Sequence, residues 1–93
     1  MSKAPINIEF GVSASYTPIK TTSTFFKGSM SNFGNNTIYL LGVDENGDPA
    51  DVPFPSTMTQ DYGAVDLLLL YAKGTPGDTL TLVGEGVAGG QAY

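Results

Sequence analysis

Turn-forming residues divide this chain so finely that no largely apolar segment exceeds eight residues. Its 93 residues include twelve glycines and six prolines, and both residue types interrupt regular structure. Between them, apolar and polar residues alternate, as Ile6, Ile8 and Phe10 do with their neighbours. A period of two is typical of a half-buried strand. Because no segment has the length and periodicity of a helix, we expect an all-β chain.

The strand boundaries follow from the turn signals. Aromatic and β-branched residues favour extended backbone near residues 21–31, and Asn46-Gly47 is the strongest short-range hairpin signal in the chain. Beyond it, Pro53 and Pro55 suit only an edge strand or a loop, because each lacks the N–H group that a sheet ladder needs. Pro76-Gly77 fits the centre of a type II turn. The expected strands therefore cover residues 6–12, 21–31, 37–41, 65–72 and 79–83, with an edge segment at 52–55, a polar turn at 56–63, and 65–72 paired with 79–83 as a hairpin.

This pattern predicts a small antiparallel β-sandwich or jelly-roll-like domain of about six to eight short strands. A chain of this length has room for one compact domain. We place that domain at residues 6–83, after a short N-terminal extension at residues 1–5. Residues 84–93 contain four glycines, and glycine loses more backbone entropy on ordering than any other residue. We therefore expect a flexible arm at the C-terminal end.

The composition argues against several classes of function. The chain has no Cys, His or Arg, so it lacks the usual general base, the thiol nucleophile and the preferred ligands of zinc. We expect no enzyme and no cofactor. With four lysines against nine acidic residues, the net charge is -5, whereas nucleic-acid binding depends on clustered basic side chains. No apolar run fits a signal peptide or a membrane span, so we expect a product made in the cytoplasm, with neither nucleic acid nor membrane as partner.

Two groups of acidic residues are candidates for a cation site and for a catalytic site. Asp44, Asn46 and Asp48 have the spacing with which calcium loops begin, but prolines stand where such a loop needs its Gly and its bidentate Glu. A solvated hairpin turn is the favoured interpretation, and cation binding at this turn stays open. Asp61 and Asp66 could be imagined as a catalytic carboxylate pair. Exposed charges on turns and strand edges are the favoured interpretation for both.

Large apolar residues outnumber the positions that so thin a domain can cover. The segment 67–71 is apolar on both faces of its expected strand, whereas a small domain buries one face of each strand. Within that strand, either Leu67 and Leu69 or Leu68 and Leu70 would face the core. Apolar groups left on an uncharged surface often pack against a second chain. The candidate interface residues are Phe25, Phe26, Phe54, Leu68, Leu70 and Tyr93, with simple core packing as the competing explanation.

The order of segments also resembles a known group of proteins. From Asn32 to Val83 the chain presents a turn of Asn and Gly, the segment 36–40 (Asn-Thr-Ile-Tyr-Leu), a polar hairpin, the apolar run 67–72, a Pro-Gly-Asp turn and the strand 79–83. This order resembles that of the small β-sandwich structural proteins of tailed bacteriophages, in pattern rather than in identical residues. The resemblance implies a protein that decorates or cements a capsid, forms head fibres or sits in a tail structure. It also implies a homo-oligomer without catalysis.

The first functional hypothesis is therefore a non-enzymatic virion structural protein, namely a capsid decoration or cement subunit of a tailed bacteriophage. Such a subunit would be made in the host cytoplasm, would self-associate, and would bind the major capsid protein or another virion protein. A trimer is the leading expectation, because capsid surfaces offer three-fold sites. A position in the head or in the tail fits the sequence equally well.

The alternative is a small carbohydrate-binding or adhesion module. Such modules stack sugar rings on exposed aromatic side chains and hydrogen-bond them with Asp and Asn. The residues that could provide these contacts are Tyr16, Tyr39, Tyr62, Tyr93, Asn35, Asn36 and Asn46.

Overall fold

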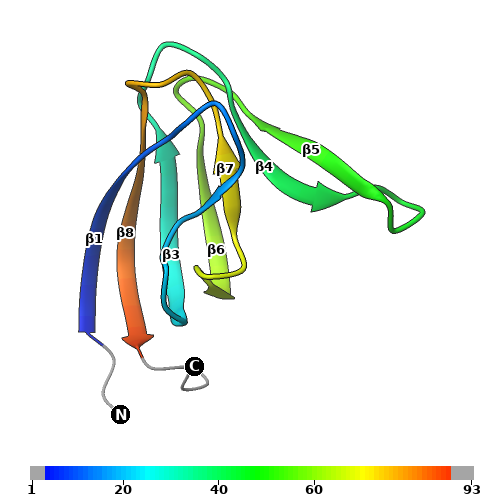
Figure 1. Ribbon diagram of the computed structural model, residues 1–93. Helices are drawn as coiled ribbons and strands as arrows, with labels where there is room; N and C mark the ends of the chain where they lie inside the picture. The colour runs from blue at the N-terminus through cyan, green and yellow to red at the C-terminus, as the bar shows by residue number, and fades with distance from the viewer. Residues whose placement is uncertain (1–3, 89–93) are drawn as a thin grey trace.

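The alternating segments of the sequence form strands that each turn one face toward a common core (Figure 1). The computed structural model describes residues 4–88, which form eight strands and no helix. None of these residues therefore belongs to a helix that could cross a membrane. The strands are β1 (Ala4–Gly11), β2 (Thr17–Pro18), β3 (Thr24–Asn32), β4 (Ile38–Val43), β5 (Pro49–Phe54), β6 (Thr59–Asp66), β7 (Tyr71–Lys73) and β8 (Thr79–Ala88).

The eight strands pair as one long hairpin that is rolled over on itself. β1 pairs with β8, β2 with β7, β3 with β6 and β4 with β5, all antiparallel. Two further pairings, of β3 with β8 and of β4 with β7, join these pairs into two sheets. The first sheet has the order β1-β8-β3-β6 and the second sheet β2-β7-β4-β5, which is the strand order of a jelly roll. The expected small antiparallel β-sandwich is confirmed.

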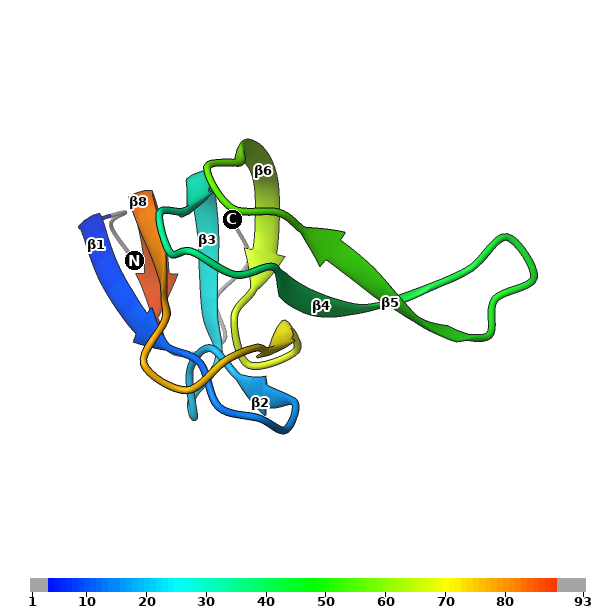
Figure 2. The same cartoon turned by 90° about the horizontal axis from the view of Figure 1, so that it is seen from above.

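The core lies between the two sheets, which face each other in Figure 2. Burying each large apolar side chain there stabilises the fold by about 1.5 to 3 kcal/mol. The edge strand β1 contributes Ile6, Ile8 and Phe10, which are partly buried against this core. The fully or almost fully buried members of the core are Phe26, Met30, Leu80 and Leu82 from the first sheet, Ile38, Leu40, Phe54 and Ala72 from the second, and Val12, Ile19 and Leu67 from connecting segments.

Residues 67–70, four consecutive leucines that we call the leucine run, form a turn rather than the expected strand. The expected hairpin of 65–72 with 79–83 is therefore wrong. β6 ends at Asp66, whose carboxylate Oδ1 accepts the backbone N–H groups of Leu68 at 3.0 Å and Thr24 at 3.1 Å. The backbone carbonyl of Asp66 also accepts the N–H of Leu69 at 3.0 Å. A side chain that bonds the nearby backbone in this way competes with strand pairing. The turn carries the chain from the first sheet to the second, so β7 and β8 lie in different sheets.

Strand β8 is longer than the expected 79–83. It includes residues 84–88, which belong to the arm that the sequence predicts to be flexible. Gly84 pairs with Ile6 on one side and with Gly28 on the other. Glycine at this position allows the backbones of neighbouring strands to approach closely, which is one common reason for a glycine within a strand. Residues 89–93 lie outside the described part of the chain. At the other end, β1 begins at Ala4, within the expected extension.

The turns predicted at Asn46-Gly47 and at Pro76-Gly77 are both confirmed. The Asn46-Gly47 segment joins β4 to β5, with Gly47 at a φ of 83°. At the other turn, Gly77 has a φ of 103° and the N–H of Asp78 donates to the carbonyl of Thr75 at 3.1 Å, as a type II turn requires. β5, which carries Pro49 and Pro53, lies at the edge of the second sheet. Proline tolerates an edge position because the missing N–H group costs no ladder hydrogen bond there.

Candidate functional site

The second sheet has an outer face that is largely apolar. In β4, Ile38 and Leu40 point into the core, so the alternate residues point outward. Residues that pair across antiparallel strands share a face, which adds the partners of these outward residues on β5 and β7. We call this surface the second-sheet face. It comprises Tyr39, Leu41 and Val43 from β4, Pro49, Asp51 and Pro53 from β5, Lys73 from β7, and Tyr16 from the segment before β2, which reaches Asp51.

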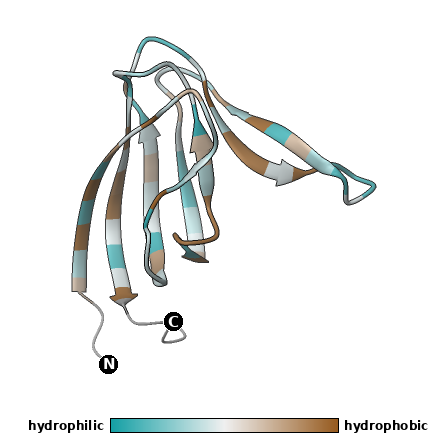
Figure 3. Cartoon of the chain, viewed as in Figure 1, coloured by the Kyte–Doolittle hydropathy of each residue, from teal (hydrophilic) through white to brown (hydrophobic). Residues whose placement is uncertain are grey.

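Apolar groups of this face are open to solvent. Leu41 is 42% exposed and Val43 is 67% exposed, and Figure 3 shows hydrophobic segments along β4 and β5. The outer face of the first sheet is different, because it carries hydroxyl groups that bond one another or a carboxylate. Ser31 Oγ lies 2.9 Å from Thr59 Oγ1, and Ser29 Oγ donates to Asp61 at 2.8 Å. The two outer faces of the sandwich therefore differ in chemistry.

The β4–β5 hairpin also extends past the first sheet, as Figure 2 shows. Near the sheets, its inner face is covered, because Ile38 and its cross-strand partner Phe54 are buried in the core. Farther along the same face, Val52 is 42% exposed. The outer half of the hairpin thus exposes apolar side chains on both faces. Contiguous apolar surface of this kind is a mark of interaction sites in soluble proteins.

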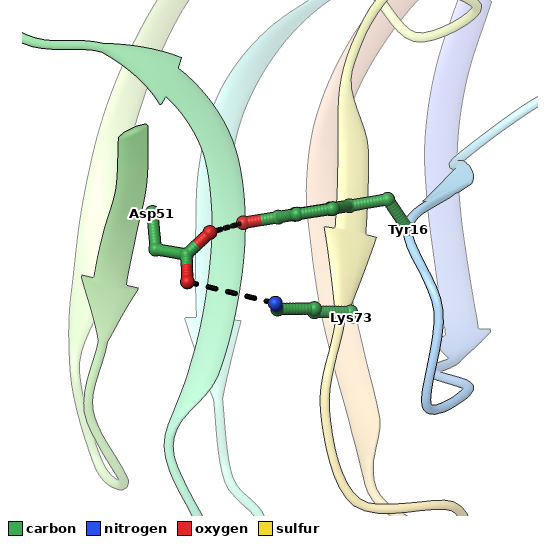
Figure 4. Close-up of polar contacts among 3 residues, drawn as sticks. All are labelled: Tyr16, Asp51 and Lys73. Carbon is green, nitrogen blue, oxygen red and sulfur yellow. Dashed lines mark hydrogen bonds and ion pairs between the residues drawn. The ribbon is translucent and has the colours of Figure 1, made fainter. Parts of the chain in front are cut away.

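A polar cluster stands in the middle of the second-sheet face (Figure 4). The hydroxyl of Tyr16 donates a hydrogen bond to Asp51 Oδ1 on β5, and Lys73 Nζ on β7 lies 3.5 Å from Asp51 Oδ2. Lys73 Nζ also lies 4.7 Å from the centroid of the Tyr16 ring, a cation–π contact. Three segments far apart in sequence are held together at this point. The cluster fixes the hairpin relative to the rest of the second sheet.

The electrostatics of the cluster keep the Tyr16 hydroxyl protonated and the Asp51 carboxylate ionised. Partial burial raises the pKa of Tyr16 to about 12, and the hydrogen bond to Asp51 and the charge of Asp51 act in the same direction. The hydrogen bond from Tyr16 lowers the pKa of Asp51, and the charge of Lys73 adds to this effect. A phenol held neutral and a carboxylate held ionised are poorly matched to acid–base catalysis at neutral pH. The charges of Asp51 and Lys73 offset each other, so the face is nearly neutral in a chain of net charge -5.

Several of the expected interface residues belong to the core instead. Phe26 and Phe54 are fully buried between the sheets, so neither is available to a partner of the folded chain. Leu70 is partly buried and packs against the same core. Phe25 and Leu68 are half-buried. Among the described strands, β4 carries apolar side chains on both of its faces, whereas the leucine run forms a turn.

The aromatic and amide residues considered for sugar binding lie in several parts of the chain. Asn35 and Asn36 are in the turn between β3 and β4, where Asn36 donates to Asp78. Tyr16 and Tyr39 lie on the second-sheet face, whereas Tyr62 packs against the core. Asn46 lies in the turn of the β4–β5 hairpin. Tyr93, which was also expected at an interface, lies outside the described residues.

The acidic residues are engaged in local structure. Asp44 Oδ1 accepts the backbone N–H groups of Asn46 at 2.9 Å and Asp48 at 3.0 Å, and these bonds shape the hairpin turn. Asp61 accepts from Ser29 and Asp66 from Ser23, so each carboxylate has its own hydroxyl partner. Within residues 4–88, no group of three or more acidic side chains is placed to hold a metal ion.

Comparison of the chain with models of protein families and with curated proteins finds no match. The resemblance to bacteriophage β-sandwich proteins therefore rests on the sequence pattern alone.

Proposed function

We propose that this protein is a non-enzymatic structural protein of a tailed bacteriophage particle, as a capsid decoration or cement subunit. In this role it associates with copies of itself, with a trimer as the first expectation. It also binds the major capsid protein or another protein of the virion. The jelly roll supports the proposal, because capsid proteins are among the main users of this fold. The same fold serves lectins and other proteins, so the fold alone does not carry the argument.

The observation that carries the proposal is the exposed apolar second-sheet face. Subunit interfaces combine an apolar centre with few charges, and this face joins Leu41 and Val43 to a single offsetting pair of charges. A second copy of a chain with net charge -5 is repelled least by a neutral surface. The projecting β4–β5 hairpin presents this surface beyond the body of the sandwich.

The experiment that tests self-association compares two charge insertions. Val43→Asp places a charge on the second-sheet face, and Val83→Asp places one at a position that is 53% exposed on the first sheet. Light scattering coupled to size-exclusion chromatography measures the mass of each protein against the 9.7 kDa of one chain. We expect an oligomer for the wild type and for Val83→Asp, and a monomer for Val43→Asp. A monomeric wild type, or an oligomer that Val43→Asp leaves intact, contradicts this use of the face.

The role in a particle has a separate test. Virions produced from the genome that encodes the chain are purified and analysed by mass spectrometry, and we expect the protein in fixed stoichiometry to the major capsid protein. Its absence from purified virions would show that the virion assignment is wrong, whatever the oligomeric state.

A further inference from the structure

A second surface feature lies on the outer face of the first sheet, at the end where its turns gather. It is a hollow of about 280 Å³. Its lining includes Glu9 of β1, Thr79 and Thr81 of β8, Phe33 from the turn after β3, and Asp78 from the turn before β8. The hollow is distinct from the second-sheet face and uses none of its residues.

The lining of the hollow combines an aromatic ring with hydrogen-bonding groups. Phe33 is 71% exposed, so its ring is open to a ligand rather than committed to the core. Glu9 and Asp78 offer carboxylate oxygens that accept hydrogen bonds, and the hydroxyls of Thr79 and Thr81 can donate or accept. A sugar ring has matching chemistry, with C–H groups on its faces and hydroxyls around its rim. Small-molecule sites typically combine an apolar wall with a few polar groups in this way.

The two turns that line the hollow are fastened in place. Asn36 Nδ2 donates to Asp78 Oδ2 at 3.1 Å, which orients the carboxylate. The backbone carbonyl of Asp78 accepts the N–H of Val12 at 3.1 Å. On the other side, the N–H of Gly34, next to Phe33, donates to Asn32 Oδ1 at 3.0 Å. A site formed in advance avoids part of the entropic cost of ordering its groups around a ligand.

Charge restricts the class of ligand. The hollow contains two carboxylates, and none of the lysines within residues 4–88 lines it. An anionic ligand such as a phosphate or an acidic sugar would meet repulsion without a compensating cation. The chemistry therefore favours a neutral, hydroxyl-rich ligand.

A row of polar residues continues from the hollow across the whole first sheet. Glu9 pairs with Thr81, Thr81 with Ser31, and Ser31 with Thr59, one residue from each of the four strands. Ser31 in this row is buried, and its hydroxyl lies 2.9 Å from that of Thr59, so the row is interrupted on the β3 strand. The polar surface open to a ligand is therefore centred on the hollow, where Glu9 and Thr81 lie.

From these observations we infer that the hollow binds one end of a neutral oligosaccharide. The Phe33 ring packs against a face of the terminal sugar, and Glu9 and Asp78 accept hydrogen bonds from its hydroxyls. This inference is independent of the structural role proposed above. It assigns a different surface and a different class of partner.

The test is a titration of the isotope-labelled protein followed by amide chemical shifts. The probes are maltotriose, cellotriose and tri-N-acetylchitotriose, three neutral trisaccharides with different linkages. We expect at least one of them to cause saturable shifts at Glu9, Phe33 and residues 78–81, with a dissociation constant of about 1 to 10 mM for a single small site. No saturable shift with any of the three overturns the inference.

Variants locate the binding. Phe33→Ala removes the exposed ring, and Asp78→Asn removes one carboxylate, so we expect each to weaken binding of the active trisaccharide about tenfold. Val83→Ala, on the same outer face but outside the hollow, is the matched control and should bind like the wild type. Binding that is unchanged in Phe33→Ala overturns the assignment. Saturable shifts with tetramethylammonium but with none of the sugars also overturn it, because they would identify a site for cations formed by the ring and the carboxylates.

Discussion

The side-chain amide of Asn32 donates a hydrogen bond of 2.8 Å to the backbone carbonyl of Phe54, which ties the end of β3 in the first sheet to the end of β5 in the second. The same amide donates to the carbonyl of Asn36 at 2.9 Å, and its Oδ1 accepts the N–H of Gly34 at 3.0 Å. Asn32 is fully buried. Within residues 4–88, no buried side-chain nitrogen or oxygen lacks a hydrogen-bond partner. One amide thus organises the turns at this end of the sandwich.

Replacing Asn32 with Leu should therefore destabilise the fold strongly. The substitution keeps the number and branching of the side-chain heavy atoms but leaves the carbonyls of Asn36 and Phe54 and the N–H of Gly34 without this partner. The bond to Phe54 is buried, whereas those to Asn36 and Gly34 are only partly buried. Since a buried group left unsatisfied costs about 1 to 3 kcal/mol, we expect a loss of about 2 to 3 kcal/mol in the free energy of unfolding, measured with urea. The control is Asn35→Ala at an exposed position in the same turn, which should change stability by about 0.5 kcal/mol or less. Equal losses in the two variants would contradict the role of Asn32.

Gly28 and Gly84 face each other across β3 and β8 where neither strand has room for a side chain. A Cβ on Gly28 would lie 2.6 Å from the Cα of Gly84, and a Cβ on Gly84 would lie 2.8 Å from the Cα of Gly28. Because the obstacle is backbone, it cannot move aside as a flexible side chain can. We expect Gly28→Ala and Gly84→Ala each to cost about 3 kcal/mol, measured by urea denaturation.

Gly63 on β6 provides the control for this prediction. A Cβ there would meet no atom within 4 Å, and the residue does not have a positive φ. Gly63→Ala should be neutral or should stabilise the fold by up to about 1 kcal/mol, because alanine reduces the entropy of the unfolded chain. If all three alanine variants had the same stability, close strand approach would not explain the glycines of β8.

Local patterns in the sequence predicted individual elements well and their long-range pairing poorly. The alternation of Ile6, Ile8 and Phe10 and the turn signal of Asn46-Gly47 act over a few residues, and the structure confirms both. In the jelly roll, however, most strands pair with partners that are distant in sequence, as β1 does with β8. The assumption that 65–72 and 79–83 pair as neighbours failed for this reason. The carboxylate of Asp66, which turns the chain out of the first sheet, has no periodic signature.

The surfaces were harder to predict than the strands. The leucine run (67–70) lies within the longest apolar segment of the sequence, but β4 is the strand in which exposed Tyr39, Leu41 and Val43 alternate with core residues. The hollow on the first sheet draws Glu9, Phe33 and its other residues from separate segments of the chain. Only the topology brings them together, so no spacing in the sequence could have indicated them.

The leucine turn makes a prediction that a continuous strand would not. Leu67 is fully buried in the core, whereas Leu69, two residues later, is 72% exposed. We expect Leu67→Ala to cost about 2 to 5 kcal/mol and Leu69→Ala to change the free energy of unfolding by about 0.5 kcal/mol or less. Thermal or urea denaturation of the two variants measures the difference. Similar losses in both would indicate that the two leucines share a face, as they would in a strand.

The Tyr16–Asp51 hydrogen bond predicts how stability depends on pH. The pKa of Tyr16 is about 12 in the folded chain, against an ordinary value of 10.0. The unfolded chain therefore loses this proton first, and the stability that the group contributes is lost as the pH rises from about 10 to about 12. The pKa of Asp51 is lowered below its ordinary 3.8, mainly by the same hydrogen bond, so its contribution is lost as the pH falls below about 4. Both effects depend on one hydroxyl group.

Tyr16→Phe removes that hydroxyl and should flatten both sides of the profile of stability against pH. Urea midpoints measured from pH 3 to pH 12 should fall less steeply at each extreme in the variant than in the wild type. Part of the alkaline slope should remain, because burial also raises the pKa of Tyr62. The matched control is Tyr39→Phe, which removes a hydroxyl on the same face but leaves the bond between Tyr16 and Asp51 in place. If Tyr16→Phe kept the slopes of the wild type, or if Tyr39→Phe flattened them equally, the hydrogen bond to Asp51 would not be their cause.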